Sequence, residues 1–280
     1  MIPLPNLHKV IEITRRAGKI LHERFETDIE VGVKGTEEIV TEADRESERF
    51  LLEELRSLLP EAGFFGEETG FHPGDSGLTW VVDPLDGTHN YSLRIPLWAC
   101  MVGLLDENRV PVLGVIDFPV LKHTIWAERG GGAFRDGEPT SVSTDPLIGT
   151  SVIGIQSKVR LDPFPGHVQR IAFRYSARSL GAIAYHTYLL VTGRMRGCAD
   201  LKVKLHDIAA PTVIIREAGG IVSDIDGSPI FPLSREFEDL VDYPLPFFAG
   251  DPRTGPELLK YLFPDGTPEG IYDPVAYQTG

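Results

Sequence analysis

The chain reads Trp80-Val81-Val82-Asp83-Pro84-Leu85-Asp86-Gly87-Thr88 where a hydrophobic strand runs directly into a polar turn. Pro84 fixes its own φ angle and lacks a backbone N–H, so the turn is rigid. Asp83 and Asp86 flank the turn, and a separation of three residues around it can aim both carboxylates at one point. Two converging carboxylates are costly without a cation, and a ligand set of oxygens alone calls for Mg²⁺, Mn²⁺ or Ca²⁺.

The groups around the two aspartates also suit a phosphate. The carbonyl of Leu85 lies between them in the sequence, and Gly87 and Thr88 offer backbone N–H groups at a predicted helix start. N–H groups in such a place bind phosphate oxygens. No cluster of Cys and His suggests zinc instead. On these residues alone, a metal-dependent phosphate site and a purely structural turn are equally good interpretations.

Outward from this turn, the chain mixes strands with helices. Runs rich in β-branched and aromatic residues predict strands. Apolar residues at a spacing of three and four predict the helices in the first part of the chain, and glycines mark the ends of the helices in the second half. We expect strands over 29–34, 78–83, 95–105, 110–118, 124–128, 150–155 and 197–201. We expect helices over 7–25, 42–59, 182–192 and 207–218. This mixture predicts a layered α+β or α/β protein.

The composition is that of an ordinary globular protein. The chain has 280 residues, of which 42% are hydrophobic and 24% are charged, and this excludes intrinsic disorder as a description of the whole. No apolar run approaches the roughly 20 residues that span a bilayer, and the first ten residues do not resemble a signal peptide. We expect a single domain over 1–280, with an N-terminal lobe over about 1–145 and a C-terminal lobe over about 146–280.

The charge balance bears on the partners. Lys and Arg number 27 against 41 Asp and Glu, which gives a net charge of −14. Such a chain repels nucleic acids and anionic membranes, so we expect neither as a partner. Cys100 and Cys198 have no metal-ligand spacing and fit a reducing cytosol, so we expect a cytoplasmic protein.

Two further acidic segments lie on either side of the rigid turn. One is Gly66-Glu67-Glu68-Thr69-Gly70, and the other is His206-Asp207-Ile208-Ala209-Ala210, which opens a helix that ends in Glu217-Ala218-Gly219-Gly220. Taken singly, the first is typical of a solvated turn, and Asp207 is typical of a helix cap. Taken together with the turn, in this order, they form a specific pattern.

The three segments resemble the inositol monophosphatase family of Mg²⁺-dependent sugar phosphatases. The family pattern is Gly-Glu-Glu, then Trp-x-x-Asp-Pro-(aliphatic)-Asp-Gly-Thr, then Trp-Asp-x-Ala-Ala. Here the first two are intact, and His206 replaces the Trp of the third. Arg178–Gly181 and Val112–Ile116 also resemble the family, and the similarity extends over nearly the whole chain. The resemblance implies a layered αβαβα sandwich of the sugar-phosphatase type.

The resemblance implies a ligand set for Mg²⁺. Glu67, Asp83 and the Leu85 carbonyl are expected to hold the first ion, and Asp86 and Asp207 are expected to hold the second, with Asp83 bridging. Two or three ions per site, with Mn²⁺ as an alternative, would roughly neutralise the four carboxylates and admit a phosphate dianion.

The resemblance also implies the catalytic residues, which are Asp44, Thr88 and Glu67. The Gly87 and Thr88 N–H groups are expected to bind phosphate oxygens, and Asp44 is expected to pair with the Thr88 hydroxyl and orient the attacking water. The implied reaction is two-metal activation of water for in-line attack on phosphorus, without a covalent enzyme intermediate. Lys34-Gly35-Thr36 falls where the family has a loop near the site, and we expect only a weak role for it.

Specificity rests on fewer residues. By resemblance, Asp200, Gly181 and Ala182 are expected to face the substrate, although Asp200 is shorter than the Glu more usual there. Lys202 and Lys204 are either solvated surface charges or, if one faces the site, a sign of a second anionic group on the substrate.

The resulting prediction is a phosphomonoesterase for a small polyol phosphate, with inositol monophosphate as the leading substrate. Histidinol phosphate is a close alternative, and fructose 1,6-bisphosphate and 3′-phosphoadenosine phosphates are others. A catalytically silent relative that binds metal or protein is the alternative from a different class. Relatives are commonly dimers, so we expect a homodimer that acts on a small phosphorylated metabolite.

Overall fold

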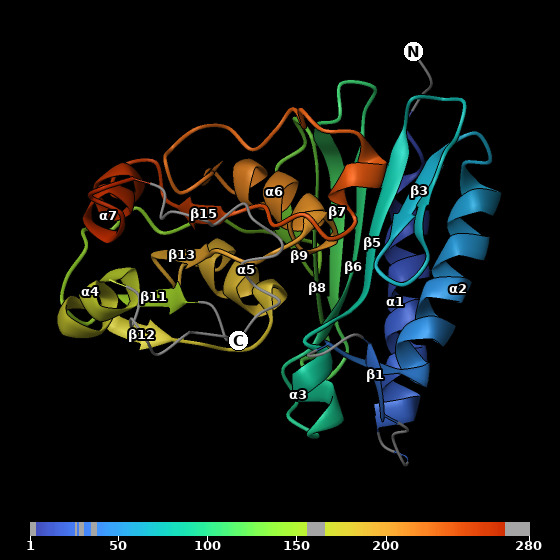
Figure 1. The fold of residues 1–280 in the computed structure, drawn as a ribbon, viewed down its shortest axis with the longest axis horizontal. Helices are drawn as coiled ribbons and strands as arrows, with labels where there is room; N and C mark the ends of the chain where they lie inside the picture. Colours follow the sequence, from blue (N-terminus) through green and yellow to red (C-terminus); the bar gives the residue numbers. More distant parts are fainter. Residues whose placement is uncertain (1–3, 26, 28–30, 35–37, 156–165, 267–280) are drawn as a thin grey trace.

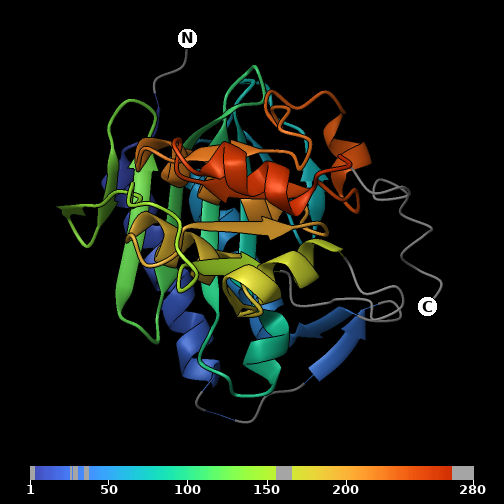
Figure 2. The ribbon, with the colours of Figure 1, turned by 90° about the vertical axis from the view of Figure 1, so that its left-hand side faces the viewer.

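The computed structural model describes residues 4–25, 27, 31–34, 38–155 and 166–266. Helices and sheets alternate in layers within this part of the chain (Figure 1, Figure 2). The expected strand over 29–34 is found as β1 (Val31–Lys34), while its first two residues lie outside the described residues. Gly35 and Thr36 of the expected loop also lie outside them.

The larger sheet has eight strands in the order β10-β9-β8-β7-β6-β5-β3-β4. They are β3 (Gly63–Gly66), β4 (Gly70–His72), β5 (Thr79–Asp86), β6 (Ala99–Leu105), β7 (Pro111–Phe118), β8 (His123–Glu128), β9 (Ala133–Arg135) and β10 (Glu138–Pro139). Within this sheet, β3 and β5 are the only neighbours that pair in parallel. In that pair, Gly66 of β3 is the partner of Val82 of β5. The residues that follow these partners, Glu67 and Asp83, therefore emerge at the same edge of the sheet.

The smaller sheet has five strands in the order β12-β11-β13-β15-β14. They are β11 (Val152–Ile155), β12 (Ser176–Arg178), β13 (Gly197–Asp200), β14 (Ile221–Ser223) and β15 (Phe247–Gly250). β11 runs parallel to both of its neighbours, and β15 runs antiparallel to both of its neighbours. Separately, β1 pairs with β2 (Glu38–Thr41) in an antiparallel ladder.

Helices separate the two sheets and cover their outer faces. They are α1 (Leu7–Phe25), α2 (Glu42–Leu58), α3 (Thr88–Ser92), α4 (Gly166–Arg174), α5 (Ile183–Val191), α6 (Leu205–Glu217), α7 (Gly255–Leu262) and the 3₁₀ turn η1 (Phe237–Leu240). α1 and α2 pack on the larger sheet, and α6 contacts β5 to β8 (Figure 1). α5 contacts α6 and β13, while α4 and α7 contact the smaller sheet. This α-β-α-β-α order confirms the predicted layered sandwich.

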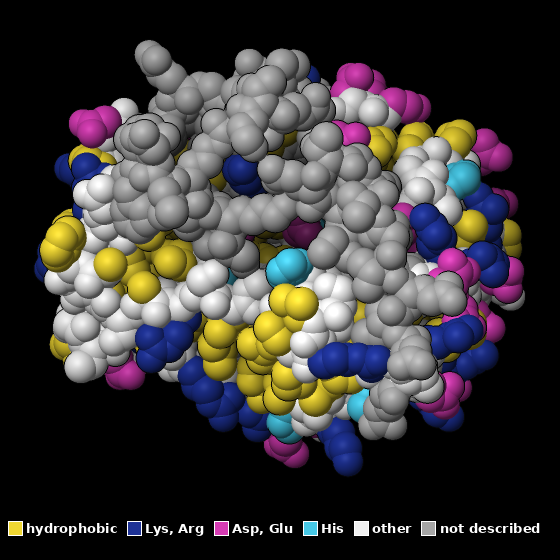
Figure 3. Space-filling view, turned by 60° about the horizontal axis from the view of Figure 1, so that its bottom comes forward, with side chains coloured by type: hydrophobic (Ala, Val, Ile, Leu, Met, Phe, Trp, Pro, Cys, Tyr) yellow, Lys and Arg dark blue, Asp and Glu magenta, His cyan; other side chains and the backbone are white. Residues whose placement is uncertain are grey.

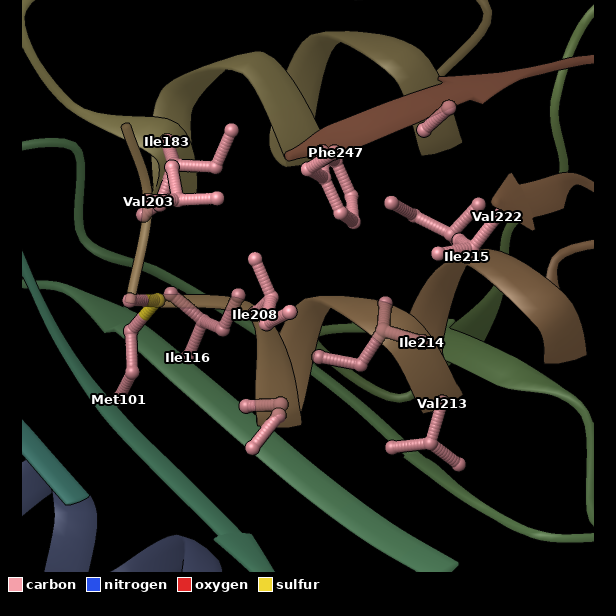
Figure 4. Packing of buried hydrophobic residues seen from close by; sticks show 14 of the residues in the cluster. Met101, Ile116, Ile183, Val203, Ile208, Val213, Ile214, Ile215, Val222 and Phe247 are labelled. Atoms are coloured by element: carbon pink, nitrogen blue, oxygen red, sulfur yellow. The ribbon is translucent and has the colours of Figure 1, made fainter. Parts of the chain in front are cut away.

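Helix α6 lies directly on the larger sheet because two paired glycines leave room for it. Gly103 in β6 is the partner of Gly114 in β7, and a Cβ atom on Gly114 would lie 2.6 Å from the carbonyl oxygen of Ala210 in α6. On its other side, α6 faces the smaller sheet, where Ile208 and Phe247 belong to one buried cluster (Figure 4). The helix is therefore clamped between both sheets.

The predicted helices are confirmed with small shifts at their ends, and α3 begins at the helix start that was predicted at Gly87 and Thr88. Helices α4 and α7 were not predicted. The predicted strand over 95–105 is wrong at its start, because β6 begins only at Ala99. Pro96 has no N–H for a strand ladder, and the Ile95 N–H donates to the carbonyl of Asn90 instead (2.8 Å). In the described part of the chain, every helix is too short or too polar to cross a bilayer.

Candidate metal and phosphate site

Three carboxylates from two elements meet at one point. Asp83 and Asp86 lie in the last four residues of strand β5, and Asp207 lies in the first turn of helix α6. One carboxylate oxygen of each lies within 4.8 Å of those of the other two. The β5–β6 pairing shifts register between Asp83 and Asp86, and this irregularity around Pro84 lets both side chains reach the same place.

Glu67 reaches the same region from the turn between β3 and β4. Its Oε1 atom lies 3.9 Å from Nε2 of His206, and Oδ1 of Asp207 lies at the same distance from that nitrogen. The buried His206 ring thus contacts two of the expected ligands. Glu67 is not among the three closely grouped carboxylates, but its charge acts on Asp83 and its side chain is 25% exposed.

Burial and mutual repulsion raise the pKa values of these acids. Burial, followed by acidic neighbours, raises the pKa of Asp83 and of Glu67 well above the ordinary range. Burial and the charge of Asp207 raise the pKa of Asp86 to about 8. A cation bound among these carboxylates would offset both effects. The donor set consists of oxygens alone, so it fits a hard divalent cation such as Mg²⁺.

The carboxylate of Asp86 also caps a helix in the next layer. It accepts the N–H groups of Ile183 (3.2 Å) and Ala184 (2.7 Å), which are the first two residues of α5. These N–H groups have no partner within the helix, so a carboxylate there stabilises the helix start. Asp86 therefore joins the larger sheet to the middle helix layer at the site itself.

The Thr88 hydroxyl lies between a carboxylate and a carbonyl. Its Oγ1 atom is 3.3 Å from Oδ1 of Asp44 and 3.0 Å from the carbonyl oxygen of Leu85. Asp44 is buried in the first turn of α2, and the Leu85 N–H donates to Asp83 (3.0 Å). The structure thus brings the expected pair Asp44 and Thr88 together, beside the turn that carries the grouped aspartates.

Gly87 permits the close approach of this turn to α5. It precedes α3 with a φ angle of 92°, a left-handed conformation that suits glycine. A Cβ atom here would lie 2.8 Å from the carbonyl oxygen of Leu97 and 3.2 Å from the Cβ atom of Ala182. The expected phosphate-binding and substrate-facing residues therefore meet at this point.

A buried acid that was not predicted supports the Glu67 turn. Glu48 of α2 accepts the N–H groups of Glu68 (2.8 Å) and Thr69 (2.7 Å). Burial raises the pKa of Glu48, and the N–H donors partly oppose this change. The sequence carries one signal for it: Glu48 lies four residues after Asp44, so both acids share a helix face.

The expected substrate residues lie on the side of the smaller sheet. Gly181 has a φ angle of 76° and packs against Asn90, whose side-chain amide donates to the carbonyls of Leu97 and Leu180 (2.8 Å each). Asp200 ends β13 and accepts the N–H of Lys202 (3.0 Å). Burial raises the pKa of Asp200 to about 7.

The two lysines between the acids differ in their surroundings. The Lys204 ammonium lies 3.1 Å from Oδ1 of Asp242, while its backbone N–H donates to Asp207. The charge of Lys202 lowers the pKa of Asp200, and that of Lys204 lowers the pKa of Glu67. Both cations therefore lie near the acids, and an acid partner offsets the charge of Lys204.

The fold is a layered arrangement of helices and sheets, and its grouped carboxylates could hold a divalent cation. Residues 6–239 match the model of the inositol monophosphatase family. The chain is 34% identical to a histidinol-phosphatase from Chlorobaculum parvum, over 80% of this chain and 87% of the relative. It is also 34% identical to an inositol-1-monophosphatase from Mesorhizobium japonicum, over 79% and 86%.

A solved structure agrees with these relatives. The extragenic suppressor protein suhB from Bartonella henselae superimposes with a TM-score of 0.82 at 27% identity, over 91% of this chain and 97% of that one. The chain belongs to the inositol monophosphatase family, whose members are metal-dependent phosphatases. It is an enzyme of that class.

Proposed function

We propose that this enzyme is a Mg²⁺-dependent phosphomonoesterase for a small polyol phosphate, with inositol monophosphate as the leading substrate. The observation that carries the proposal is the group formed by the buried carboxylates of Asp83 and Asp86 and the partly exposed carboxylate of Asp207, one oxygen of each lying within 4.8 Å of the others. Relatives with this activity in their names support the choice of substrate.

The ligand residues of the proposal are Glu67, Asp83 and the Leu85 carbonyl for one ion, and Asp86 and Asp207, with Asp83 shared, for another. Two or three Mg²⁺ ions per site, or Mn²⁺ in their place, would balance the acids and allow a phosphate dianion to enter. Bound ions would supply the Lewis-acid charge that activates the phosphate ester and the attacking water.

The residues of the chain supply the positioning in this proposal. The backbone N–H groups of Gly87 and Thr88 bind phosphate oxygens. Asp44 and the Thr88 hydroxyl, which lie 3.3 Å apart, hold the attacking water in line with phosphorus. Glu67 is the third catalytic residue of the proposal, by the resemblance of Gly66-Glu67-Glu68 to the family pattern.

The substrate hydroxyls face Gly181, Ala182 and Asp200 in this proposal. The carboxylate of Asp200, although shorter than the Glu more usual in the family, can accept a hydrogen bond from a substrate hydroxyl. Asp200 ends β13 of the smaller sheet, whereas Asp83 belongs to β5 and Glu67 follows β3 of the larger sheet. In this proposal the substrate is therefore contacted by residues of both sheets.

Histidinol phosphate is the second candidate substrate. Its ammonium group would be repelled by free lysines beside the site, but Lys204 is paired with Asp242 (3.1 Å). Asp200 offers a carboxylate for an ammonium as readily as for a hydroxyl. The name of the relative from Chlorobaculum parvum supports this candidate as well.

We also propose that the protein is cytoplasmic and forms a homodimer. Each chain would be a single domain with two lobes that divide near residue 145. Leu93 and Ile95, which follow α3, expose large apolar side chains, and hydrophobic side chains gather on the face drawn in Figure 3. An apolar surface of this kind supports self-association. Light scattering after size-exclusion chromatography measures the mass and checks the dimer.

Phosphate release measured with and without Mg²⁺ tests the proposed activity. The panel contains inositol 1-phosphate, histidinol phosphate, fructose 1,6-bisphosphate and 3′-phosphoadenosine 5′-phosphate. We expect release only with the metal, and the highest kcat/KM for inositol 1-phosphate. A higher value for histidinol phosphate would support the second candidate, and metal-independent release would contradict the proposal.

A further inference from the structure

Helix α2 presents two buried acids to two different loops of the site. Asp44 and Glu48 are 1% and 0% exposed, and they lie about one helical turn apart on the same face. Asp44 lies beside Thr88 in the turn that follows β5. Glu48 contacts the turn between β3 and β4, which carries Glu67.

The Glu48 carboxylate holds that turn with both of its oxygens. Oε2 accepts the N–H of Glu68 at 2.8 Å, and Oε1 accepts the N–H of Thr69 at 2.7 Å. Short hydrogen bonds that a carboxylate accepts are stronger than bonds between neutral groups. The Glu48 side chain is fully buried, so water has little access to the acceptor oxygens.

The chain on the other side of Glu67 lies against the same carboxylate. A Cβ atom on Gly66 would lie 2.5 Å from Oε1 and 2.6 Å from Cδ of Glu48. The φ angle of Gly66 is outside the left-handed region, so the close approach to Glu48 is what requires glycine. Glu48 therefore contacts the backbone immediately before and immediately after Glu67.

We propose that Glu48 is a positioning residue that seats the Gly66–Thr69 turn on α2 and thereby holds Glu67 in place to bind Mg²⁺. The inference rests on the proposed function, because it requires Glu67 to be a ligand. A ligand held in place before the ion arrives loses less conformational freedom on binding. Removing a group that orients a metal ligand typically weakens metal affinity by roughly 10- to 100-fold.

Glu48→Gln tests the inference without changing the size of the side chain. The amide keeps one acceptor oxygen, but its NH₂ group faces one of the two N–H donors. We expect the affinity for Mg²⁺ alone, measured by isothermal titration calorimetry, to fall by roughly 10- to 100-fold. We expect kcat to recover at saturating Mg²⁺. Glu53→Gln on the exposed face of α2 is the matched control and should change neither value.

Gly66→Ala attacks the same contact from the turn and leaves the charge unchanged. Its Cβ atom would displace the Glu48 carboxylate, so we expect a similar loss of Mg²⁺ affinity. The double variant should lose little more than either single variant, because both break one contact. Gly149→Ala is the matched control, since a Cβ atom there meets nothing closer than 3.6 Å.

A Glu67→Gln variant separates the two ways in which the inference can fail. If Glu67→Gln leaves Mg²⁺ affinity unchanged, the proposed ligand role of Glu67 is wrong. If Glu67→Gln weakens binding while folded Glu48→Gln and Gly66→Ala proteins bind Mg²⁺ normally, the positioning role is overturned. Lower thermal stability of the metal-free variants with unchanged Mg²⁺ affinity would likewise reduce Glu48 to a structural role.

Discussion

Asp86 shows how much one side chain does at this site. Its carboxylate lies with those of Asp83 and Asp207, and it also accepts two N–H groups at the start of α5. The first contact is a matter of charge, whereas the second is a matter of acceptor geometry. A substitution that keeps the shape but removes the charge therefore separates the two.

Asp86→Asn is expected to fold and to lose nearly all turnover. The amide oxygen can still accept one N–H of α5, so the loss of one hydrogen bond costs about 1 kcal/mol. The missing charge should lower kcat by about 100-fold or more, as for other groups that act electrostatically at the reacting centre. Phosphate release and circular dichroism measure the two effects. A folded variant with normal turnover would remove Asp86 from the site.

At the scale of elements, the sheet decides where α6 can lie. The paired glycines Gly103 and Gly114 bring the backbone of α6 against β6 and β7. Since Asp207 is in the first turn of α6, the depth of the helix sets the depth of that carboxylate. The sequence shows a glycine in each strand but gives no sign that the two are opposite each other.

Gly114→Ala is expected to push α6 away from the sheet. The new Cβ atom would lie 2.6 Å from the carbonyl oxygen of Ala210 and 2.7 Å from Cγ1 of Val213, so the helix has to move. Overpacking of this kind costs about 1–3 kcal/mol. Denaturant unfolding measures that cost, and calorimetry should show weaker Mg²⁺ binding because Asp207 shifts. Stability and affinity like those of Gly149→Ala would contradict this account.

At the scale of the whole molecule, the acidic group links stability to pH and to metal. The pKa of Asp86 is raised to about 8 and that of Asp200 to about 7, so the folded state binds protons that the unfolded state has lost. The free energy of unfolding of the metal-free protein therefore falls as pH rises. His167 and His186 have lowered pKa values and affect stability only below about pH 6.5.

We expect the Tm of the metal-free protein to fall between about pH 6.5 and about pH 8. The free energy of unfolding can fall by about 1.4 kcal/mol per pH unit for each extra proton that the folded state binds. In the proposed function Mg²⁺ binds the ionised acids of the folded state, so we expect it to raise Tm most at the upper end of this range. Differential scanning fluorimetry measures both effects. A Tm that rises with pH without metal would contradict the assignment, and Asp86→Asn should show a smaller slope.

The pattern of residues along the chain predicted much of the fold and pointed to the acids that the structure groups together. Hydrophobic spacing located α1 and α2, because one buried face leaves a periodic signal. Helices α5 and α6 are buried on nearly all sides and were located instead by the glycines that follow them. Hydrophobic spacing gave no signal for the short helix α3, whose five residues are too few, and only Gly87 and Thr88 indicated where that helix starts. The pattern also missed Glu48, because burial of an acid depends on a partner from elsewhere in the chain.

The sequence by itself determined the layered class, the rigid Asp83–Thr88 turn and the acids that the family pattern marks. These features depend on residues that are adjacent or share one local element. The tertiary structure alone decided that Glu48 holds the Glu67 turn, that Asp86 caps α5 and that Lys204 pairs with Asp242. Each of these contacts joins residues at least 20 positions apart, and only the packing of layers brings such groups together.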